Sequence, residues 1–323
     1  MANESLKRLL GGRPVHVLYG GFSNERPVSL VSGESVAAAL EGAGHRVVRV
    51  DVDKGFASEG NALLAGTGLA FIVLHGEFGE DGEIQEILEG WGTPYTGSGP
   101  QASRLAMDKA LAKKEFAAAG VPTPRWEGVP RSARPDDLAG RYGLPLVIKP
   151  SCSGSSIGVT IVREAGQIAA ALAEAGRHSG VPLVEEFIPG RELTVGILGD
   201  AALPVIELRA RKQFYDYEAK YADDAGTEYL CPAPVDAAVA AEAGRLSLAA
   251  HRALGCRHFS RVDLRLTPEG RLSVLEVNTI PGFTSHSLLP KAAAAAGLDF
   301  RALVERIAAM ALGDFSGGHG HGI

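Results

Sequence analysis

Cysteine, excess positive charge and long apolar runs are all scarce in this sequence. The cysteines, Cys152, Cys231 and Cys256, are odd in number and lack the spacing of metal ligands, so we expect buried, reduced thiols in a reducing cytoplasm. No apolar run approaches the roughly 20 residues that span a bilayer, and the N-terminus lacks the apolar region of a signal peptide. A formal net charge of -6 argues against a broad surface for nucleic acids or anionic membranes.

What is present is enough apolar sequence for two or three domains. The chain has 323 residues, of which 46% are hydrophobic, so it can bury a large core. Residues 15–21 have the pattern of a buried strand, and residues 28–40 have helical apolar spacing. Further strands are predicted at 46–52 and at 69–75, where the apolar run is continuous. Strands of this kind are covered on both faces, which predicts an α/β domain with a parallel sheet.

Ligands of parallel sheets gather beyond the carboxyl ends of the strands. This places the loops at 20–25 and 75–77 on one rim of the first domain. A helix is predicted from about Ser103 to Ala119, and the turn residues at 120–124 end it.

The composition after that turn changes to short strands and loops. Strands at 144–149 and 159–162 and a helix at 166–175 predict a small α+β lid. A third α+β part follows, with strands at 192–198 and 202–208, an alanine-rich helix, a hairpin and a closing helix at 300–312. We predict domains at 1–105, 106–188 and 189–315, and a disordered tail at 316–323.

The hairpin at 261–278 carries the most informative pattern. Its two strands are joined by a Pro/Gly turn, so they would align Asp263 with Glu276 and Asn278. Hard oxygen donors of this kind suit a magnesium ion that shares its remaining positions with phosphates and water. Arg261 adds a cation, and the turn ending at Gly282 can present backbone N–H groups to an oxyanion. A solvated hairpin with ordinary surface carboxylates is the alternative reading.

A second pattern is the Ser/Gly-rich loop that follows Lys149. It can cover phosphates with backbone N–H and hydroxyl groups, but it is neither a P-loop nor a dinucleotide fingerprint. A flexible hairpin loop has the same composition. Lys109 and Lys220 are of a type usually found on the surface. Glu185 and Glu186 end a strand where they could bind adenine and ribose, or lie on the surface as a pair of acids.

Several motifs in fixed order extend over almost the whole chain. They are GGFSNER at 20–26, HGEFGEDG at 75–82, YTGS at 95–98, MDK at 107–109, FYDYEAKY at 214–221 and EVNTIPGFTSHSL at 276–288. In these motifs the sequence resembles the ATP-grasp enzymes, and within them the D-alanine:D-alanine ligases. The resemblance implies three domains, with ATP held between the second and the third.

The resemblance also implies a role for each matching residue. ATP would be bound with two Mg²⁺ or Mn²⁺ ions, whose ligands would be Asp263, Glu276 and Asn278. Arg261 and the backbone N–H of Gly282 would stabilise the oxyanion. The nucleotide would be contacted by Lys109, Lys149, Ser155, Glu185, Glu186, Ile188, Glu192 and Lys220.

For the amino acids, the resemblance places the first substrate's ammonium group at Glu25, with His75 beside the same subsite. Glu25, Ser155 and Tyr221 would form a hydrogen-bonded trio that closes the site. Ser287 would contact the carboxylate of the second substrate, although an isolated serine there would read as a helix N-cap.

The reaction implied is the ATP-dependent joining of two D-alanines through a D-alanyl phosphate, for peptidoglycan synthesis, in a cytoplasmic homodimer that binds neither nucleic acid nor membrane. A ligase that takes D-lactate or D-serine, and a nucleotide-binding module without activity, are the alternatives. Tyr221 favours the dipeptide-forming type, because ligases that use D-lactate carry a histidine near this place. Ser153 and Pro27 depart from the acidic residues common in the family.

Overall fold

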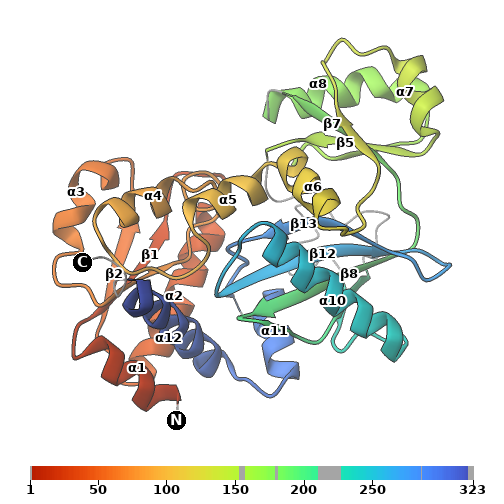
Figure 1. Ribbon diagram of the computed structural model, residues 1–323. Helices are drawn as coiled ribbons and strands as arrows, with labels where there is room; N and C mark the ends of the chain where they lie inside the picture. Colours follow the sequence, from red (N-terminus) through yellow and green to blue (C-terminus); the bar gives the residue numbers. More distant parts are fainter. Residues whose placement is uncertain (1, 153–156, 179–180, 210–226, 285, 319–323) are drawn as a thin grey trace.

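Three β-sheets, formed by successive parts of the chain, organise the fold (Figure 1). The computed structural model describes residues 2–152, 157–178, 181–209, 227–284 and 286–318. A parallel sheet comes first, a small antiparallel sheet follows, and a larger antiparallel sheet comes last. This order is the predicted α/β part followed by two α+β parts.

The first sheet is parallel, as the alternation of strand and helix predicts. In it β1 (Val15–Gly20) lies between β2 (Val47–Val52) and β3 (Leu69–Ile72). Every residue of β3 is buried, which accounts for its unbroken apolar run, although the strand ends three residues before the predicted limit. The helices of this part are α1 (Ala2–Leu10), α2 (Arg26–Gly42), α3 (Phe56–Leu63) and α4 (Glu83–Gly90).

The second sheet forms a small lid with a core of its own. Its antiparallel strands lie in the order β4 (Trp126–Gly128), β7 (Pro182–Glu186), β5 (Leu146–Pro150) and β6 (Thr160–Val162). Its helices are α7 (Pro135–Tyr142), the short 3-10 helix η1 (Ala165–Gln167) and α8 (Ile168–His178). The apolar cluster between them comes only from residues 129–184, so the lid packs separately from the rest and projects from it in Figure 1.

The third sheet carries the predicted hairpin. Its strands lie in the order β11 (Glu228–Leu230), β10 (Ile206–Arg209), β8 (Arg191–Leu198), β12 (Phe259–Leu266) and β13 (Leu272–Asn278), with β9 (Ala201–Ala202) paired to β8. The alanine-rich helix α10 (Ala237–Ala253) packs on β8, β12 and β13. On the other side of β8, α11 (Leu288–Ala295) approaches Gly196 with Leu289.

The single helix predicted from Ser103 to Ala119 is wrong, because two helices occupy this stretch. α5 (Pro100–Met107) ends and α6 (Lys109–Ala118) begins at Asp108, whose backbone is extended. The Asp108 carboxylate accepts hydrogen bonds from the amide groups of Ala110 and Leu111. An aspartate in this position satisfies amide groups at the start of a helix, so the apolar spacing continues through a break in the backbone.

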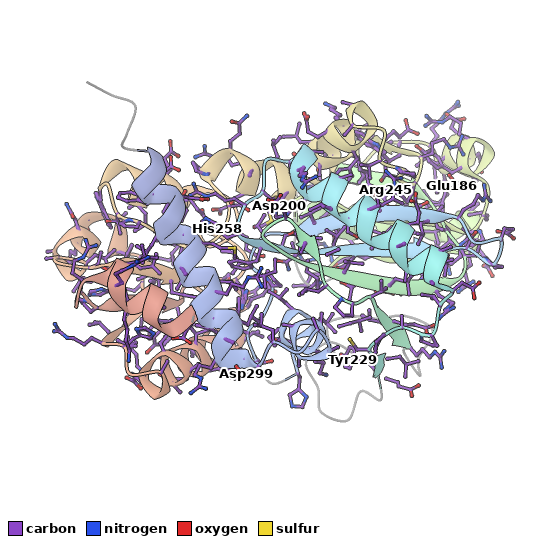
Figure 2. All side chains as sticks on the ribbon, turned by 60° about the horizontal axis from the view of Figure 1, so that its bottom comes forward. Glu186, Asp200, Tyr229, Arg245, His258 and Asp299 are labelled. Atoms are coloured by element: carbon purple, nitrogen blue, oxygen red, sulfur yellow. The ribbon has the colours of Figure 1, made fainter. Side chains whose placement is uncertain are left out.

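The last helix returns to the first sheet. α12 (Phe300–Gly318) packs against α1 and α2, and its apolar side chains join the core shared by the first and third sheets. His258, labelled in Figure 2, contacts Asp314 of α12 at 3.0 Å. The helix extends three residues into the segment predicted as a disordered tail, because adding a residue to an existing helix costs little free energy. Residues 319–323 lie outside the described part.

Candidate active site

Charged side chains alternate along one face of the β12–β13 hairpin. Asp263 pairs with Glu276 and Arg261 with Asn278, so the predicted hairpin is confirmed. Arg261 holds Asp263 through two hydrogen bonds, Nε to Oδ1 at 2.9 Å and Nη2 to Oδ2 at 2.8 Å. The Thr194 hydroxyl on β8 donates to the same Asp263 Oδ1 at 2.6 Å. The carboxylate is therefore held in a fixed orientation beside a cation.

A β-bulge turns Glu276 toward this face. The register of the hairpin shifts at Leu275, which has no partner position on β12. Leu272 and Val274 are buried, and by strict alternation Glu276 would follow them into the core. After the bulge Val277 is the buried residue instead, and the Glu276 side chain keeps 31% of its surface exposed.

Lys109 approaches the hairpin from the start of α6. Its Nζ lies 3.3 Å from Oε2 of Glu276. The Ser151 hydroxyl donates to Asp108 at 2.7 Å, and the Lys109 amide donates to the Ser151 carbonyl at 3.0 Å. These bonds tie the start of α6 to the end of β5, the strand that carries Lys149.

Lys149 is buried against an acid of the neighbouring strand. Its Nζ lies 2.9 Å from Oε1 of Glu185 on β7, and Nζ of Lys113 on α6 lies 3.1 Å from the same oxygen. Burial alone would raise the pKa of Glu185, but Lys149 and Lys113 outweigh it and lower the pKa below its usual value. Burial lowers the pKa of Lys113 to about 8, against the opposing effect of Glu185. The Glu185 carboxylate is thus paired inside the protein.

The remaining residues of the predicted nucleotide segment lie between the end of β7 and the start of β8. Glu186 is exposed at the end of that strand (Figure 2). Arg265 on β12 donates to the carbonyl oxygens of Ile188 at 3.2 Å and Gly190 at 2.8 Å, and its Nη1 lies 3.5 Å from Oε2 of Glu192. One arginine of the third sheet therefore holds the connection between the lid strand β7 and β8.

Glu25 and His75 lie on one rim of the first sheet, as predicted. The Ser23 hydroxyl donates to the His75 carbonyl oxygen at 2.6 Å. A Cβ atom at Gly76 would lie 2.9 Å from Oε2 of Glu25, so the two loops are in close contact. Glu25 and His75 are both buried.

The ring of His75 connects this rim to the segment after β13. Its Nδ1 lies 3.0 Å from the carbonyl oxygen of Ile280. Because a carbonyl oxygen only accepts, Nδ1 carries the proton, and Nε2 faces the Ser32 hydroxyl at 3.4 Å. Burial lowers the pKa of His75, although Glu25 opposes this effect, so the neutral ring is favoured.

A further buried carboxyl, Glu80, lies beside Glu25. Its Oε2 accepts a hydrogen bond from the Gly76 amide at 2.7 Å. Burial, reinforced by the charge of Glu25, raises the pKa of Glu80 to about 8. Glu80 therefore differs from an ordinary exposed carboxylate.

Gly282 and Ser287 are close neighbours. A Cβ atom at Gly282 would lie 2.6 Å from Oγ of Ser287, so only glycine fits without displacement. Ser287 is the N-cap residue of α11, but its hydroxyl accepts from the Thr284 amide at 2.9 Å and does not cap the first turn. The residue thus has the position of an N-cap without the side-chain bond of one.

Four residues named from the sequence lie outside the described residues: Ser153, Ser155, Lys220 and Tyr221. The predicted closure of Ser155 and Tyr221 over Glu25 is therefore not described. Among the other predicted residues, Lys109 contacts Glu276, Lys149 contacts Glu185 and Arg261 contacts Asp263. His75 contacts the backbone of Ile280, and Glu186 is exposed.

The sequence is similar to those of known ligases. A model of the family described as "D-ala D-ala ligase C-terminus" matches residues 116–309. The chain belongs to the D-alanine–D-alanine ligase family. The D-alanine–D-alanine ligase of Pelobacter propionicus is 49% identical over 298 residues, 91% of this chain and 94% of that protein. The enzyme of the same description from Acidiphilium cryptum is 50% identical over 292 residues, 90% of this chain and 95% of that protein.

Solved structures agree with this membership of the ligase family. The crystal structure of D-alanine–D-alanine ligase from Bacillus anthracis complexed with ATP has a TM-score of 0.83 and 32% identity, and the match covers 95% of this chain and 99% of that chain. The predicted ATP-grasp fold, with a parallel N-terminal sheet, a lid and a C-terminal α+β part, is thereby confirmed. Among the described residues, none of the helices is sufficiently long and apolar to cross a membrane.

The donor set of the hairpin fits a hard cation in a ligase of this family. Asp263, Glu276 and Asn278 offer only oxygen, and they lie on adjacent strands in register. Within the described parts of the chain, His, Cys, Asp and Glu side chains do not form a cluster of three or more that would bind a metal. Magnesium in such surroundings takes its remaining ligands from water and substrate phosphates.

Sequence reasoning missed three residues of this site: Lys113, Arg265 and Glu80. Lys113 follows Lys109 by four positions, one turn along the same helix, and that spacing was a signal. Arg265 follows Arg261 and Asp263 on one face of a strand, which was another. The burial of Glu80 had no signal in the local sequence.

Proposed function

We propose that the protein joins two molecules of D-alanine, using ATP and releasing ADP and phosphate. The observation that carries this proposal is the pairing of carboxylates with cations on one face of the hairpin, Arg261 with Asp263 and Lys109 with Glu276. Such a face offers oxygen donors for metal ions and cations for phosphates. Relatives described as D-alanine–D-alanine ligases, about half identical to the chain, support the choice of substrate.

In the first step, a carboxylate oxygen of one D-alanine attacks the γ-phosphorus of ATP. The bond from that phosphorus to the bridging oxygen breaks, ADP leaves, and a D-alanyl phosphate forms. Lys109 and Lys149 would contact the phosphates, and most of the rate enhancement would come from placing positive charge there.

In the second step, the amine nitrogen of the other D-alanine attacks the acyl carbon. A C–N bond forms, the C–O bond breaks with its electron pair going to the departing phosphate, and the nitrogen gives up a proton to that phosphate. Arg261 and the backbone N–H of Gly282 are proposed to stabilise the tetrahedral oxyanion. Loss of one such donor typically costs about 2.7–4 kcal/mol in the transition state.

Asp263, Glu276 and Asn278 would hold one or two Mg²⁺ or Mn²⁺ ions. Held by these three side chains, such ions would neutralise the charge that develops on the phosphate oxygens. The Asn278 Oδ1 atom already accepts from the Ile280 amide at 3.0 Å, which fixes the direction of the side chain.

Glu25 is proposed to receive the ammonium group of the first substrate, and Ser287 the carboxylate of the second. The burial of Glu25 and His75 supports this arrangement, since a charged substrate group binds more strongly away from water. Ser155, Lys220 and Tyr221 keep their predicted roles in closure and nucleotide binding, and Glu185, Glu186, Ile188 and Glu192 keep theirs beside the nucleotide.

The experiment is a product assay with ATP, magnesium and a panel of D-alanine, D-serine and D-lactate. We expect phosphate release that requires D-alanine, and a D-alanyl-D-alanine product identified by mass. A folded sample that releases no phosphate with D-alanine would refute the proposal. If a product forms only when D-lactate or D-serine is present, the second substrate is that compound and not D-alanine.

The cellular setting follows from the product. A dipeptide of two D-amino acids suits peptidoglycan precursor synthesis, and ATP and reduced thiols suit the cytoplasm. We also infer a homodimer and the division at 1–105, 106–188 and 189–315. Sedimentation of the purified protein tests the dimer.

A further inference from the structure

Three charged side chains meet inside the protein where α6 passes the lid sheet. Lys113 of α6, Glu185 of β7 and Lys149 of β5 have 0%, 2% and 6% of their surface exposed. Both lysines approach the same oxygen, Oε1 of Glu185, at 3.1 Å and 2.9 Å. Lys113 also donates to the Thr123 hydroxyl at 2.6 Å. We call these residues the buried trio: Lys113, Glu185 and Lys149.

One carboxylate in the buried trio is matched by two ammonium groups. A buried charge needs a partner, but one lysine is enough to compensate Glu185. The second lysine is therefore available to another anion. The two differ in where they lie: Lys113 is enclosed on α6, whereas the Lys149 side chain keeps 8% of its surface exposed near the end of β5.

We propose that Lys113 is a positioning residue that keeps Glu185 compensated, so that Lys149 can turn from Glu185 to the phosphates of ATP. This inference rests on the proposed function, in which Lys149 contacts the nucleotide. Without Lys113, the same movement would leave a carboxylate buried and unpaired. Lys149 would then be held on Glu185, and ATP would bind more weakly.

The test compares Lys113→Met with wild type in the full chain. Isothermal titration with MgATP measures affinity, and initial rates give KM for ATP and for D-alanine. We expect ATP binding to weaken at least about 100-fold, because the Glu185 carboxylate would stay buried without a partner when Lys149 leaves it. We expect KM for D-alanine to change less than about twofold. Lys114→Met is the matched control, because Lys114 is exposed on the same helix.

A second comparison isolates the coupling from any effect on folding. Glu185→Gln removes the charge that Lys113 compensates, so adding Lys113→Met to it should change ATP affinity less than about threefold. A helix residue that matters only for packing would give the same loss in both backgrounds. Lys113→Met leaves Glu185 paired with Lys149, so without ATP this site has one acid and one lysine and the variant remains measurable.

Two results would overturn the role of Lys113. One is a folded Lys113→Met protein with wild-type ATP affinity, and the other is an equal loss with and without Glu185→Gln. Failure of the proposed function has a different signature: wild type would bind MgATP in the titration but release no phosphate with D-alanine.

Discussion

Replacing Arg265 with methionine should weaken ATP binding without affecting the D-alanine subsites. The side chain holds the connection from the lid to the third sheet by hydrogen bonds to Ile188 and Gly190 and by contact with Glu192. Gly190 has φ of +116°, and a Cβ atom there would lie 2.1 Å from the Leu266 carbonyl oxygen. The connection therefore packs closely against β12 at Gly190, the residue whose carbonyl oxygen accepts a hydrogen bond from Arg265.

The magnitude follows from the bonds lost. A hydrogen bond from a charged donor contributes about 1.5–3 kcal/mol, and the partly exposed contact with Glu192 at 3.5 Å adds little. Without Arg265, part of the binding free energy of ATP would be used to order the connection between β7 and β8. Each 1.4 kcal/mol used in this way weakens ATP binding about tenfold. One such bond, at about 1.5–3 kcal/mol, corresponds to about 10- to 150-fold, so we expect KM for ATP to rise by a factor in that range in Arg265→Met.

The assay measures ADP release below the unfolding temperature, varying ATP at saturating D-alanine and then the reverse. KM for D-alanine should change less than about twofold. Arg271→Met is the control, because Arg271 lies at the turn of the same hairpin with 80% of its side chain exposed. An unchanged KM for ATP, or equal rises for both substrates, would show that Arg265 only supports the fold.

Three further outcomes are expected. Glu276→Gln should bind ATP in a titration yet lose turnover at least about a hundredfold, since it removes a charged metal ligand; near-normal turnover would contradict the metal assignment. Gly282→Ala should raise KM for the second D-alanine about tenfold, because the new Cβ atom would lie 2.6 Å from Oγ of Ser287 and displace that hydroxyl. An unchanged KM would show that Ser287 does not belong to that subsite. Burial lowers the pKa of His258 from 6.5 to about 4, so between these values the unfolded chain binds more protons and stability falls as the pH drops. In His258→Asn, urea unfolding should depend less on pH over that range, and an equally steep dependence would assign it to other groups.

The hairpin shows how far the sequence alone could go. Alternating residues and a Pro/Gly turn were enough to place Asp263 opposite Glu276. The same alternation, continued through β13, would have buried Glu276 with Val274. The bulge at Leu275 prevents this, and whether a strand accommodates an extra residue depends on its neighbours in the sheet.

The helix break at Asp108 is a similar case. The apolar spacing on either side is helical, so periodicity predicted one helix. The carboxylate that starts α6 accepts a hydrogen bond from the Ser151 hydroxyl, which lies 43 residues further along the chain, directly after β5. The local sequence contained the capping residue, Asp108, but the hydrogen bond from Ser151 that stabilises the cap is a tertiary contact.

The sequence by itself determined the parallel first sheet, the hairpin and the rim that carries Glu25 and His75, because each follows from the period of apolar residues and the direction of the strands. Only the tertiary structure decided which charges are paired. Lys113 pairs with Glu185, and Arg265 donates to the Ile188 carbonyl oxygen. In both contacts the partners are far apart in the sequence, so no local pattern could have predicted them. Burial, which sets the cost of leaving such a charge unpaired, exists only once the lid and the third sheet have packed around it.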